Sequence, residues 1–418
     1  MSKGCEIKRT GEKHLVPALR FPEFRESASW DFVNGNNLFA PIVNKNHNSD
    51  LPILAITQDK GAVPRNLIDY NVIVSDNSIK SYKIVEVGDF IISLRSFQGG
   101  IEYSNYKGLC SPAYIVLRKI SDTVYNDFYR HYLKSANYIL ELNRNIEGIR
   151  DGKMISYLQF SNIKLPFPFP EEQQKIAACL SSIDEEISAM KEKVEQLKTH
   201  KKGLMQKLFP VEGKYVPEVR FPEFRNDGEW EEKELHEIAK HETAKNKENC
   251  KYPVLTNSAI YGIVPQQDYF DRKIVTNDNL NNYQIVEYND FVYNPRVSTE
   301  SPVGPISRNK ICMGIMSPLY TIFRFKEKNV DYFEYYFGTD VWHESIKKKA
   351  NYGARFDRIN ISIDDFFSLP IQCPSPDERQ KIAECFSYAE KLISLYESKV
   401  SLLERHKKGL MQQLFPKL

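Results

Sequence analysis

Hydrophobic residues recur in alternating steps of four and three along two stretches of the chain, 176–208 and 382–414. This 3.5-residue period continues over many turns, which is typical of a coiled-coil seam. One lysine interrupts the series at the equivalent place in each stretch, Lys201 in the first and Lys407 in the second. The predicted seam consists of Ile176, Leu180, Ile183, Ile187, Met190, Val194 and Leu197, and of Ile382, Phe386, Ile393, Tyr396, Val400 and Leu403.

The two predicted helices have start signals and a common length. Pro170 suits the first turn of a helix, and Ser375 to Glu378 has the spacing of a capping box. From residue 171 to 202 the first helix would span about 48 Å at 1.5 Å per residue. Because both seams lie in one chain, we expect them to pair with each other. A dimerisation zipper between two chains is the alternative.

The remainder of the chain predicts strands followed by helices. Short β-branched and aromatic runs such as LPILAIT (51–57) and AYIVLR (113–118) are separated by Asn, Gly and Pro, as strands are. A helical pattern follows at 127–142 and again at 331–349. Each of these regions is therefore expected to be a mixed α and β domain.

The chain contains the same sequence words twice, in the same order. The pairs are VPALRFPEF (16–24) and VPEVRFPEF (216–224), YKIVEVGDF (82–90) and YQIVEYNDF (283–291), SPAYIVLR (111–118) and SPLYTIFR (317–324), PEEQQKIAACL (170–180) and PDERQKIAECF (376–386), and HKKGLMQKLFP (200–210) and HKKGLMQQLFP (406–416). A period near 200 residues indicates two copies of a whole domain with its attached helix, since solenoids repeat every 20–50 residues. We expect an α+β fold with domains at 1–168 and 210–374, and coiled-coil helices at 169–209 and 375–418.

Composition and charge are those of an ordinary globular protein. The 418 residues are 41% hydrophobic and 27% charged, with a net charge of +2, so any nucleic-acid binding must come from local basic faces. The seven cysteines form no CxxC pair and suit a reducing compartment. No stretch approaches the roughly 20 apolar residues of a spanning helix, and the polar first residues are no signal peptide. The sequence predicts a cytoplasmic protein that does not enter a membrane.

The sequence contains no recognisable catalytic constellation. It has no methyltransferase motif such as NPPF or DPPY, no GxxxxGK[ST] phosphate loop, and no HxxxH or Ser/His/Asp arrangement. Pro376-Asp377-Glu378 could be taken for a nuclease carboxylate pair, but its position at a helix start favours capping. These absences favour a recognition module over an enzyme.

The order domain, helix, domain, helix resembles the specificity (S) subunits of type I restriction–modification systems. The resemblance rests on VPxxRFPEF at the start of each copy, GDF or NDF inside each domain, and QKIA and HKKGLMQ on each helix. It implies two target-recognition domains that each read half of a bipartite double-stranded DNA sequence, joined by two antiparallel helices in a pseudo-two-fold arrangement.

The resemblance also implies partners. Two methyltransferase (M) subunits would dock on the helices, and restriction (R) subunits would add cleavage. S-adenosylmethionine, ATP and Mg would be bound by those partners, with no cofactor and no metal on this chain. Two identical M partners need two equivalent docking surfaces, which explains why the helices are alike, whereas two different half-sites need domains that differ.

Candidate DNA contacts lie on loops at equivalent positions of the two domains. Arg95 and Arg296 each follow a strand, and arginine is the commonest reader of guanine and a strong phosphate ligand. The alternative is a framework ion pair with Asp89 or Asp290. The other candidates are Ser96 and Gln98, Ser298 and Thr299, Arg65 and Gln266, and the basic loop residues Arg150, Lys153, Arg355 and Arg358, for which an exposed loop without function is the alternative.

We therefore expect a DNA sequence-specificity subunit that is catalytically inert by itself. An alternative from another class is a tandem-domain protein-interaction scaffold that does not read DNA. Basic loops at equivalent positions of both domains favour the DNA reader. An enzyme of unknown type is disfavoured by the missing motifs.

Overall fold

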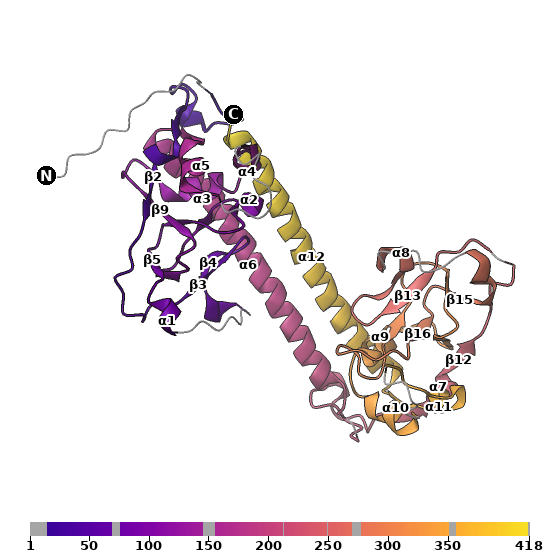
Figure 1. Ribbon diagram of the computed structural model, residues 1–418. Coiled ribbons are helices and arrows are strands. Elements are labelled where there is room, and N and C mark those ends of the chain that lie inside the picture. The colour runs from indigo at the N-terminus through magenta and orange to yellow at the C-terminus, as the bar shows by residue number, and fades with distance from the viewer. Residues whose placement is uncertain are drawn as a thin grey trace. The chain divides into compact units, whose positions relative to one another are not determined.

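The computed structural model describes residues 15–68, 76–144, 155–211, 213–248, 250–269, 277–350 and 357–416. The chain divides into two compact units. Unit 1 comprises residues 1–192 and 397–418, and unit 2 comprises residues 193–396. Two long helices, α6 (Pro170–Leu208) and α12 (Pro376–Leu414), each contribute one part to unit 1 and the other part to unit 2 (Figure 1).

Unit 1 is built on antiparallel strands with short helices. A four-stranded sheet has the order β2-β9-β6-β7, and two-stranded sheets pair β1 with β10, β3 with β4, and β5 with β8. The strands are β1 (Asp31–Asn34), β2 (Phe39–Ile42), β3 (Leu54–Thr57), β4 (Gly61–Pro64), β5 (Lys83–Val85), β6 (Phe90–Ile92), β7 (Glu102–Tyr103), β8 (Gly108–Cys110), β9 (Ile115–Lys119) and β10 (Lys164–Phe167). The helices are α1 (Asp76–Ile79), α2 (Ser96–Gly99), α3 (Asn126–Tyr132), α4 (Ala136–Arg144) and α5 (Tyr157–Asn162).

Unit 2 repeats this strand order. Its four-stranded sheet is β12-β19-β16-β17, and its two-stranded sheets pair β11 with β20, β13 with β14, and β15 with β18. The strands are β11 (Glu231–Glu234), β12 (Ala239–Glu242), β13 (Leu255–Ser258), β14 (Gly262–Pro265), β15 (Gln284–Val286), β16 (Phe291–Tyr293), β17 (Ile306–Arg308), β18 (Gly314–Met316), β19 (Thr321–Phe325) and β20 (Pro370–Cys373). The helices are α7 (Leu235–Ile238), α8 (Gln266–Tyr269), α9 (Asp331–Phe337), α10 (His343–Lys349) and α11 (Ile363–Phe367). The predicted α+β fold with two sheet-containing domains and long helices is confirmed.

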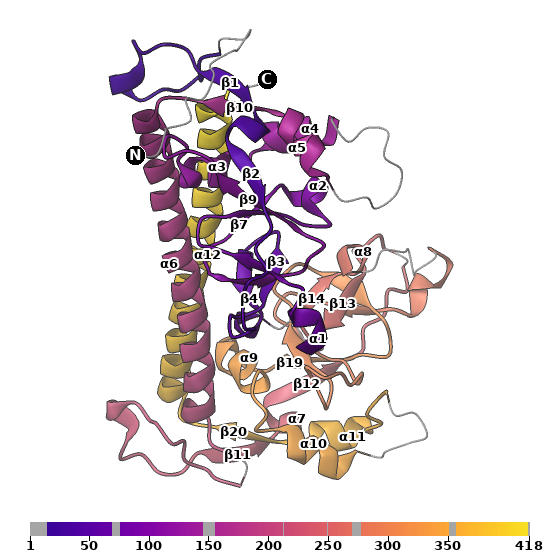
Figure 2. The same cartoon turned by 60° about the vertical axis from the view of Figure 1, so that its left-hand side comes forward.

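Within each unit the long helices pair in opposite directions. In unit 1 the first half of α6 lies beside the second half of α12 (Figure 2), where Lys399 contacts Glu186 and Lys191 contacts Glu404. All thirteen predicted seam residues are buried or half-buried. Ile176 and Leu180 also belong to the hydrophobic core of unit 1, and Ile382 and Phe386 to that of unit 2. The first turns of each helix are therefore part of a domain core as well as of the helix pair.

The end of each long helix completes the core of the domain that belongs to the other sequence copy. Phe415, directly after α12, packs edge-to-face on Phe128 and Tyr132 of α3 in unit 1. Phe209, directly after α6, packs on Trp230 and Phe386 in unit 2. The compact units therefore divide the chain differently from the four consecutive segments expected from the sequence. Side-chain periodicity along one helix does not reveal which distant domain its end enters.

The lysines that interrupt the seam each form an ion pair across the helix pair. In unit 1 the Lys407 ammonium donates to both carboxylate oxygens of Asp184, at 2.5 and 2.6 Å. In unit 2 the Lys201 ammonium donates to Glu390 at 2.6 Å. Lys201 and Asp184 occupy positions equivalent to those of Lys407 and Glu390, so the interruption of the apolar seam is a matched pair of ionic contacts.

A residue of the neighbouring domain joins each of these ion pairs. The His131 ring lies 3.7 Å from Asp184 and within hydrogen-bond distance of the Ser181 hydroxyl, at 3.1 Å. Burial lowers the pKa of His131 to about 3, the positive charges of Lys407 and Arg130 act in the same direction, and Asp184 opposes them. In unit 2 the Tyr335 hydroxyl donates to Glu390 at 3.1 Å. These contacts attach α3 and α9 to the helix pair.

A buried ion pair attaches the opening word of each copy to the start of its long helix. Arg20 donates to both carboxylate oxygens of Glu172 at 2.7 Å, and Arg220 donates to Glu378 at 2.7 and 2.6 Å. The Glu378 amide donates to the Ser375 hydroxyl at 3.3 Å, as a cap requires. The predicted capping box is only partly correct, because the Glu378 carboxylate binds Arg220 instead of returning to the helix start.

Candidate nucleic-acid interface

Each four-stranded sheet is crossed by one aspartate–arginine pair. Arg118 on β9 donates to both oxygens of Asp89 at 2.7 Å, and Arg324 on β19 donates to Asp290 at 2.6 and 3.0 Å. A backbone amide also donates to each aspartate, from Glu86 at 2.8 Å and from Glu287 at 2.7 Å. Burial raises the pKa of Asp290 and the Arg324 guanidinium opposes that shift. The aspartate of GDF or NDF is thus paired with the arginine that ends SPAYIVLR or SPLYTIFR.

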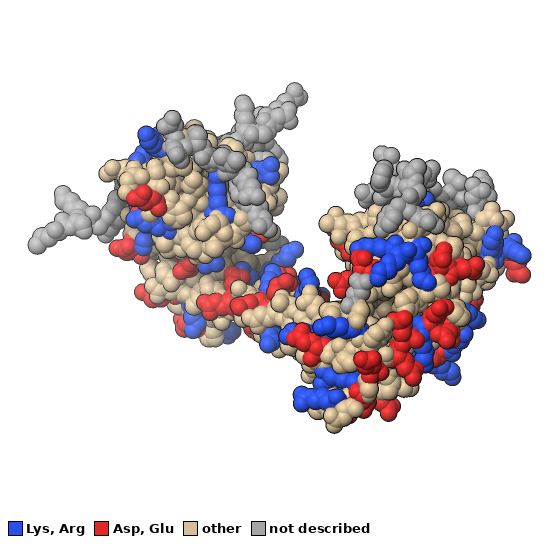
Figure 3. All heavy atoms as spheres, turned by 90° about the horizontal axis from the view of Figure 1, so that it is seen from below, with Lys and Arg blue, Asp and Glu red and all other residues tan. Residues whose placement is uncertain are grey.

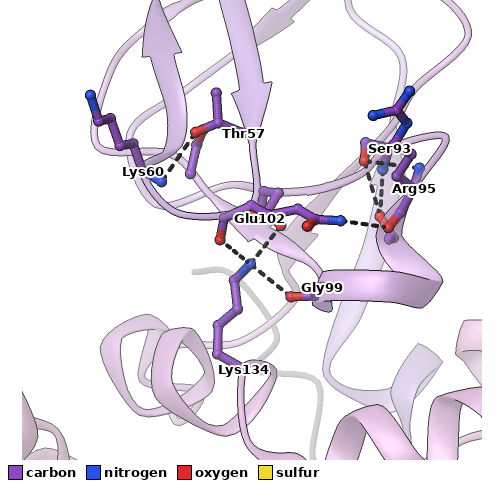
Figure 4. Close-up of polar contacts among 10 residues, drawn as sticks. Thr57, Lys60, Ser93, Arg95, Gly99, Glu102 and Lys134 are labelled. Atoms are coloured by element: carbon purple, nitrogen blue, oxygen red, sulfur yellow. Dashed lines mark hydrogen bonds and ion pairs between the residues drawn. The ribbon is translucent and has the colours of Figure 1, made fainter. Parts of the chain in front are cut away.

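This pair decides between the two interpretations of Arg95 and Arg296. Neither arginine is the partner of Asp89 or Asp290, so the framework ion pair expected as their alternative is formed by other residues. Both are exposed, and among the described residues neither guanidinium has an ion-pair partner. The Arg95 guanidinium projects away from the loop contacts that hold its backbone (Figure 4). Both side chains are available to an external ligand.

The loop that carries Arg95 separates two of the other candidates. Gln98 is exposed on α2, whereas Ser96 is buried, and the Ser93 amide donates to the Ser96 hydroxyl at 2.6 Å. A hydroxyl enclosed in this way shapes the loop and does not face outward. The Ser96 side chain is therefore not exposed to a DNA ligand in this structure, although the sequence suggested it as a reader.

The loop that carries Arg296 brings two candidates together. Arg296 and Arg358, which are 62 positions apart, form an isolated antiparallel bridge, and the Ile359 amide donates to the Pro295 carbonyl at 2.9 Å. Arg358 is half-buried, while Ser298 and Thr299 are exposed. This part of unit 2 therefore concentrates two arginines beside exposed hydroxyl groups. The sequence did not indicate that these two arginines would be neighbours.

Arg65 and Gln266 also occupy equivalent places. Each directly follows the second strand of a hairpin, Arg65 at the start of a 3-10 turn (Arg65–Leu67) and Gln266 at the start of α8. The Arg65 amide donates to the Ile53 carbonyl at 3.0 Å, and the Gln266 amide donates to the Val254 carbonyl at 2.9 Å. Both side chains are half-buried. The candidates Arg150, Lys153 and Arg355 lie outside the described residues.

Charge on the surface is mixed. Lys and Arg side chains are interspersed with Asp and Glu on the face seen in Figure 3, in agreement with the net charge of +2.

Over the described ranges, no group of three or more His, Cys, Asp and Glu residues is arranged to hold a metal ion. None of the helices in the described part of the chain is long and apolar enough to cross a membrane. Because the surface charge is mixed, an anionic ligand would bind to individual basic residues such as Arg95 in unit 1 and Arg296 and Arg358 in unit 2.

Comparison with known proteins shows which proteins this chain resembles. Residues 32–199 match the type I restriction modification DNA specificity domain. The putative type I restriction enzyme MjaX specificity subunit of Methanocaldococcus jannaschii is 29% identical over 277 residues, which cover 62% of this chain and 60% of that protein. The MjaVIII specificity subunit of the same organism is 25% identical over 355 residues, covering 79% of each chain.

A solved structure shows the same fold. The S subunit of a type I restriction–modification system from M. genitalium aligns with 97% of this chain and 100% of its own, with a TM-score of 0.52 and 14% sequence identity. At that identity the likeness concerns the fold alone. This likeness in fold spans nearly the whole chain, including both domains and both long helices, and the two related specificity subunits are similar in sequence. The chain is therefore similar in sequence and in fold to type I restriction–modification specificity subunits.

Proposed function

We propose that this chain is the DNA sequence-specificity subunit of a type I restriction–modification complex. Unit 1 reads one half of a bipartite double-stranded target and unit 2 reads the other. The similarity to type I specificity subunits and the duplicated architecture support this function, because a pseudo-two-fold protein with two different domains suits a site with two different halves.

One observation supports DNA reading more than any other. Arg95 and Arg296 follow equivalent strands, both are exposed, and the sheet aspartates that could have neutralised them are paired with other arginines. Arginine side chains that are free to project from a rigid sheet can bind guanine edges or phosphates. Their exposed neighbours differ, with Gln98 in unit 1 and Ser298 and Thr299 in unit 2. Equal anchors with unequal neighbours are what two readers of different half-sites require.

Chemistry is assigned to partner subunits in this proposal. Two M subunits dock on the α6–α12 helix pair and bind S-adenosylmethionine, and R subunits bind ATP and Mg and add cleavage. This chain supplies no catalytic residue and acts in the cytoplasm. The absence of recognisable methyltransferase and phosphate-loop motifs in the sequence supports this division of roles.

Exchange of one reader tests the function. Residues 31–165 would be replaced by the equivalent segment of another family member, and methylated sites would be mapped in cells that express the complex with its M subunits. We expect one half of the methylated sequence to change and the other half to remain. Assembly with M subunits but no sequence-dependent methylation would favour the interaction scaffold, and a change in both halves would contradict independent reading.

A further inference from the structure

The loop that carries Arg95 rests on the junction between α3 and α4. It connects β6 to β7 and is closed by the Gly100 amide, which donates to the Ser96 carbonyl at 2.7 Å. Gly100 has a φ of +82°, and a Cβ added to it would lie 2.3 Å from the Leu133 carbonyl oxygen. Only glycine allows this approach, so the loop and the α3–α4 junction fit together without space for adjustment.

Lys134 binds two loops at once from this junction. Its ammonium donates to the Gly99 carbonyl at 2.8 Å, to the Gln58 carbonyl at 3.0 Å, and to the Glu102 carboxylate at 2.5 Å (Figure 4). A lysine ammonium has three donors, and all three are used. Gly99 belongs to the Arg95 loop, whereas Gln58 belongs to the turn between β3 and β4. Lys134 therefore fixes these two segments relative to each other.

Glu102 gives this contact its charge. Its carboxylate is buried, one oxygen accepts from Lys134, and the other accepts no hydrogen bond within the described residues. Burial raises the pKa of Glu102 to about 7, against the lowering effect of Lys134. A buried ion pair with an unsatisfied oxygen adds little to stability and is costly when one partner is removed. Such a pair is better explained by the geometry it imposes than by the stability it contributes.

Unit 2 holds its loop by a different device. Ser307 pairs with Val292 as Glu102 pairs with Ile91, so unit 2 has a hydroxyl in the place of the Glu102 carboxylate. There the side-chain amide of Asn257 donates to the Val292 backbone carbonyl at 2.7 Å, and the side-chain amide of Asn294 donates to the Asn257 backbone carbonyl at 2.9 Å. The Asn294 side-chain oxygen also accepts from the Arg296 amide at 3.1 Å. The loops that carry Arg95 and Arg296 are thus each held by side-chain hydrogen bonds, from a lysine ammonium in unit 1 and from neutral asparagine amides in unit 2.

We propose that Lys134 is a positioning residue for half-site recognition by unit 1, because its ammonium sets the Arg95 loop against the β3–β4 turn that carries Lys60. The inference rests on the proposed function, and it adds the β3–β4 turn to the segments through which unit 1 would contact DNA. Lys60 is exposed, and Figure 4 shows its side chain and that of Arg95 projecting away from Lys134. The clamp therefore acts through the placement of two outward cations and does not touch DNA itself.

Two variants separate positioning from plain stability. Lys134→Met removes all three donors and leaves the buried Glu102 carboxyl without its partner. Lys134→Met combined with Glu102→Gln also replaces that carboxyl by a neutral amide, so its melting temperature should return close to that of the wild type. Asn294→Ala is the matched control, because it loosens the amide clamp of unit 2 and leaves unit 1 intact.

The measurement is affinity of the M-loaded complex for three DNA fragments: the intact target, one altered in the unit 1 half-site, and one altered in the unit 2 half-site. Exchange of residues 31–165 identifies which half belongs to unit 1. In the double variant we expect discrimination at the unit 1 half-site to fall about tenfold, within the range of one bidentate base contact, with no change at the other half. Asn294→Ala should give the reverse pattern.

The outcomes separate the possible failures. Unchanged discrimination at the unit 1 half-site in both Lys134 variants would overturn the positioning role. Equal loss at both half-sites, in parallel with the melting temperature, would reduce Lys134 to a stabilising residue and would also overturn it. Failure of the wild-type complex to discriminate either altered fragment would instead reject the proposed function.

Discussion

Removal of one phenyl ring near the C-terminus should loosen the domain formed mainly by the first half of the chain. Phe415 is fully buried in unit 1, where its ring centroid lies 5.6 Å from that of Phe128 and 5.4 Å from that of Tyr132. The Asn137 amide also donates to the Phe415 carbonyl at 3.3 Å. Phe415→Ala would remove both ring contacts and leave a cavity between α3 and the end of α12.

The expected cost follows from burial. Phe→Ala substitutions in a core destabilise by about 3–5 kcal/mol, and a loss of about 4 kcal/mol corresponds to a roughly 1,000-fold fall in amide protection. Because whole domains are stable by only about 5–15 kcal/mol, unit 1 should open far more often than in the wild type. Hydrogen exchange measured on the full chain would follow α3 and α4 as reporters of unit 1, and α9 as the reporter of unit 2.

The duplicated sequence supplies its own control. Phe209 occupies the equivalent place in unit 2, with its ring 6.4 Å from Trp230 and 6.0 Å from Phe386. Phe209→Ala should lower protection in α9 and leave α3 and α4 unchanged, which is the opposite of the Phe415→Ala pattern. Equal loss in both units for either variant, or no loss in α3 for Phe415→Ala, would refute the assignment of each helix end to the opposite domain.

Three other perturbations test the framework, a buried histidine and the helix pair. Arg95→Ala and Arg296→Ala should weaken DNA binding, measured at two salt concentrations, without lowering the melting temperature. Arg118→Met should instead lower the free energy of unfolding by roughly 2 kcal/mol, because it leaves the buried Asp89 without its partner. The cost is no larger because Arg118 itself is partly exposed to solvent. The folded-state pKa of His131, about 3, lies below the roughly 6.5 of an unfolded chain, so its contribution to unit 1 stability is complete above pH 6.5 and is lost as the pH falls toward 3, by at most about 1.4 kcal/mol per unit. His131→Gln should flatten the pH dependence of the free energy of unfolding. Glu102, with its raised pKa, makes stability fall as the pH rises, but it does so equally in the wild type and in the variant. An unchanged slope would therefore contradict the lowered pKa of His131. Paired insertions of seven residues in α6 and α12 keep the seam in register and add about 10 Å, so mapped sites should gain about three unread base pairs, and an unchanged gap would reject the helices as a spacer.

The sequence predicted the features that repeat locally. Periodicity located the two long helices, and the order of the repeated words predicted that the two domains would share a topology, as the identical strand orders show. These features depend on patterns within a few turns or on direct comparison of the two copies. They need no knowledge of which distant residues meet.

The sequence could not identify the partners of charged residues. Asp89 could have paired with Arg95, which is six positions away, but its partner is Arg118 on the neighbouring strand. Strand pairing made this choice, since β6 and β9 are adjacent in the sheet. One signal was available for the helices: Asp184 and Glu390 are acidic at equivalent positions, as are the basic Lys407 and Lys201. Comparing the copies charge by charge would have suggested those ion pairs.

The structure also changes the reason why the helix words are alike. Lys407, Leu414 and Phe415 of HKKGLMQQLFP, and their equivalents in HKKGLMQKLFP, make ion pairs or core contacts within their own units. Packing alone therefore explains their identity in the two copies, without any M subunit. Identity at these positions is no evidence for partner docking.

Three other letters of the same word lack this explanation. His200, Lys202 and Gln206 are exposed in unit 2, and the identical residues His406, Lys408 and Gln412 are exposed in unit 1. Since packing does not require these side chains, their identity in both copies favours a surface presented twice to the same partner. Replacing the three by alanine in one copy should leave thermal stability unchanged. If the chain docks two M subunits as proposed, the substitution should reduce the number bound to one, measured as the mass of the assembled complex. Loss of both M subunits, or of neither, would contradict two equivalent docking surfaces.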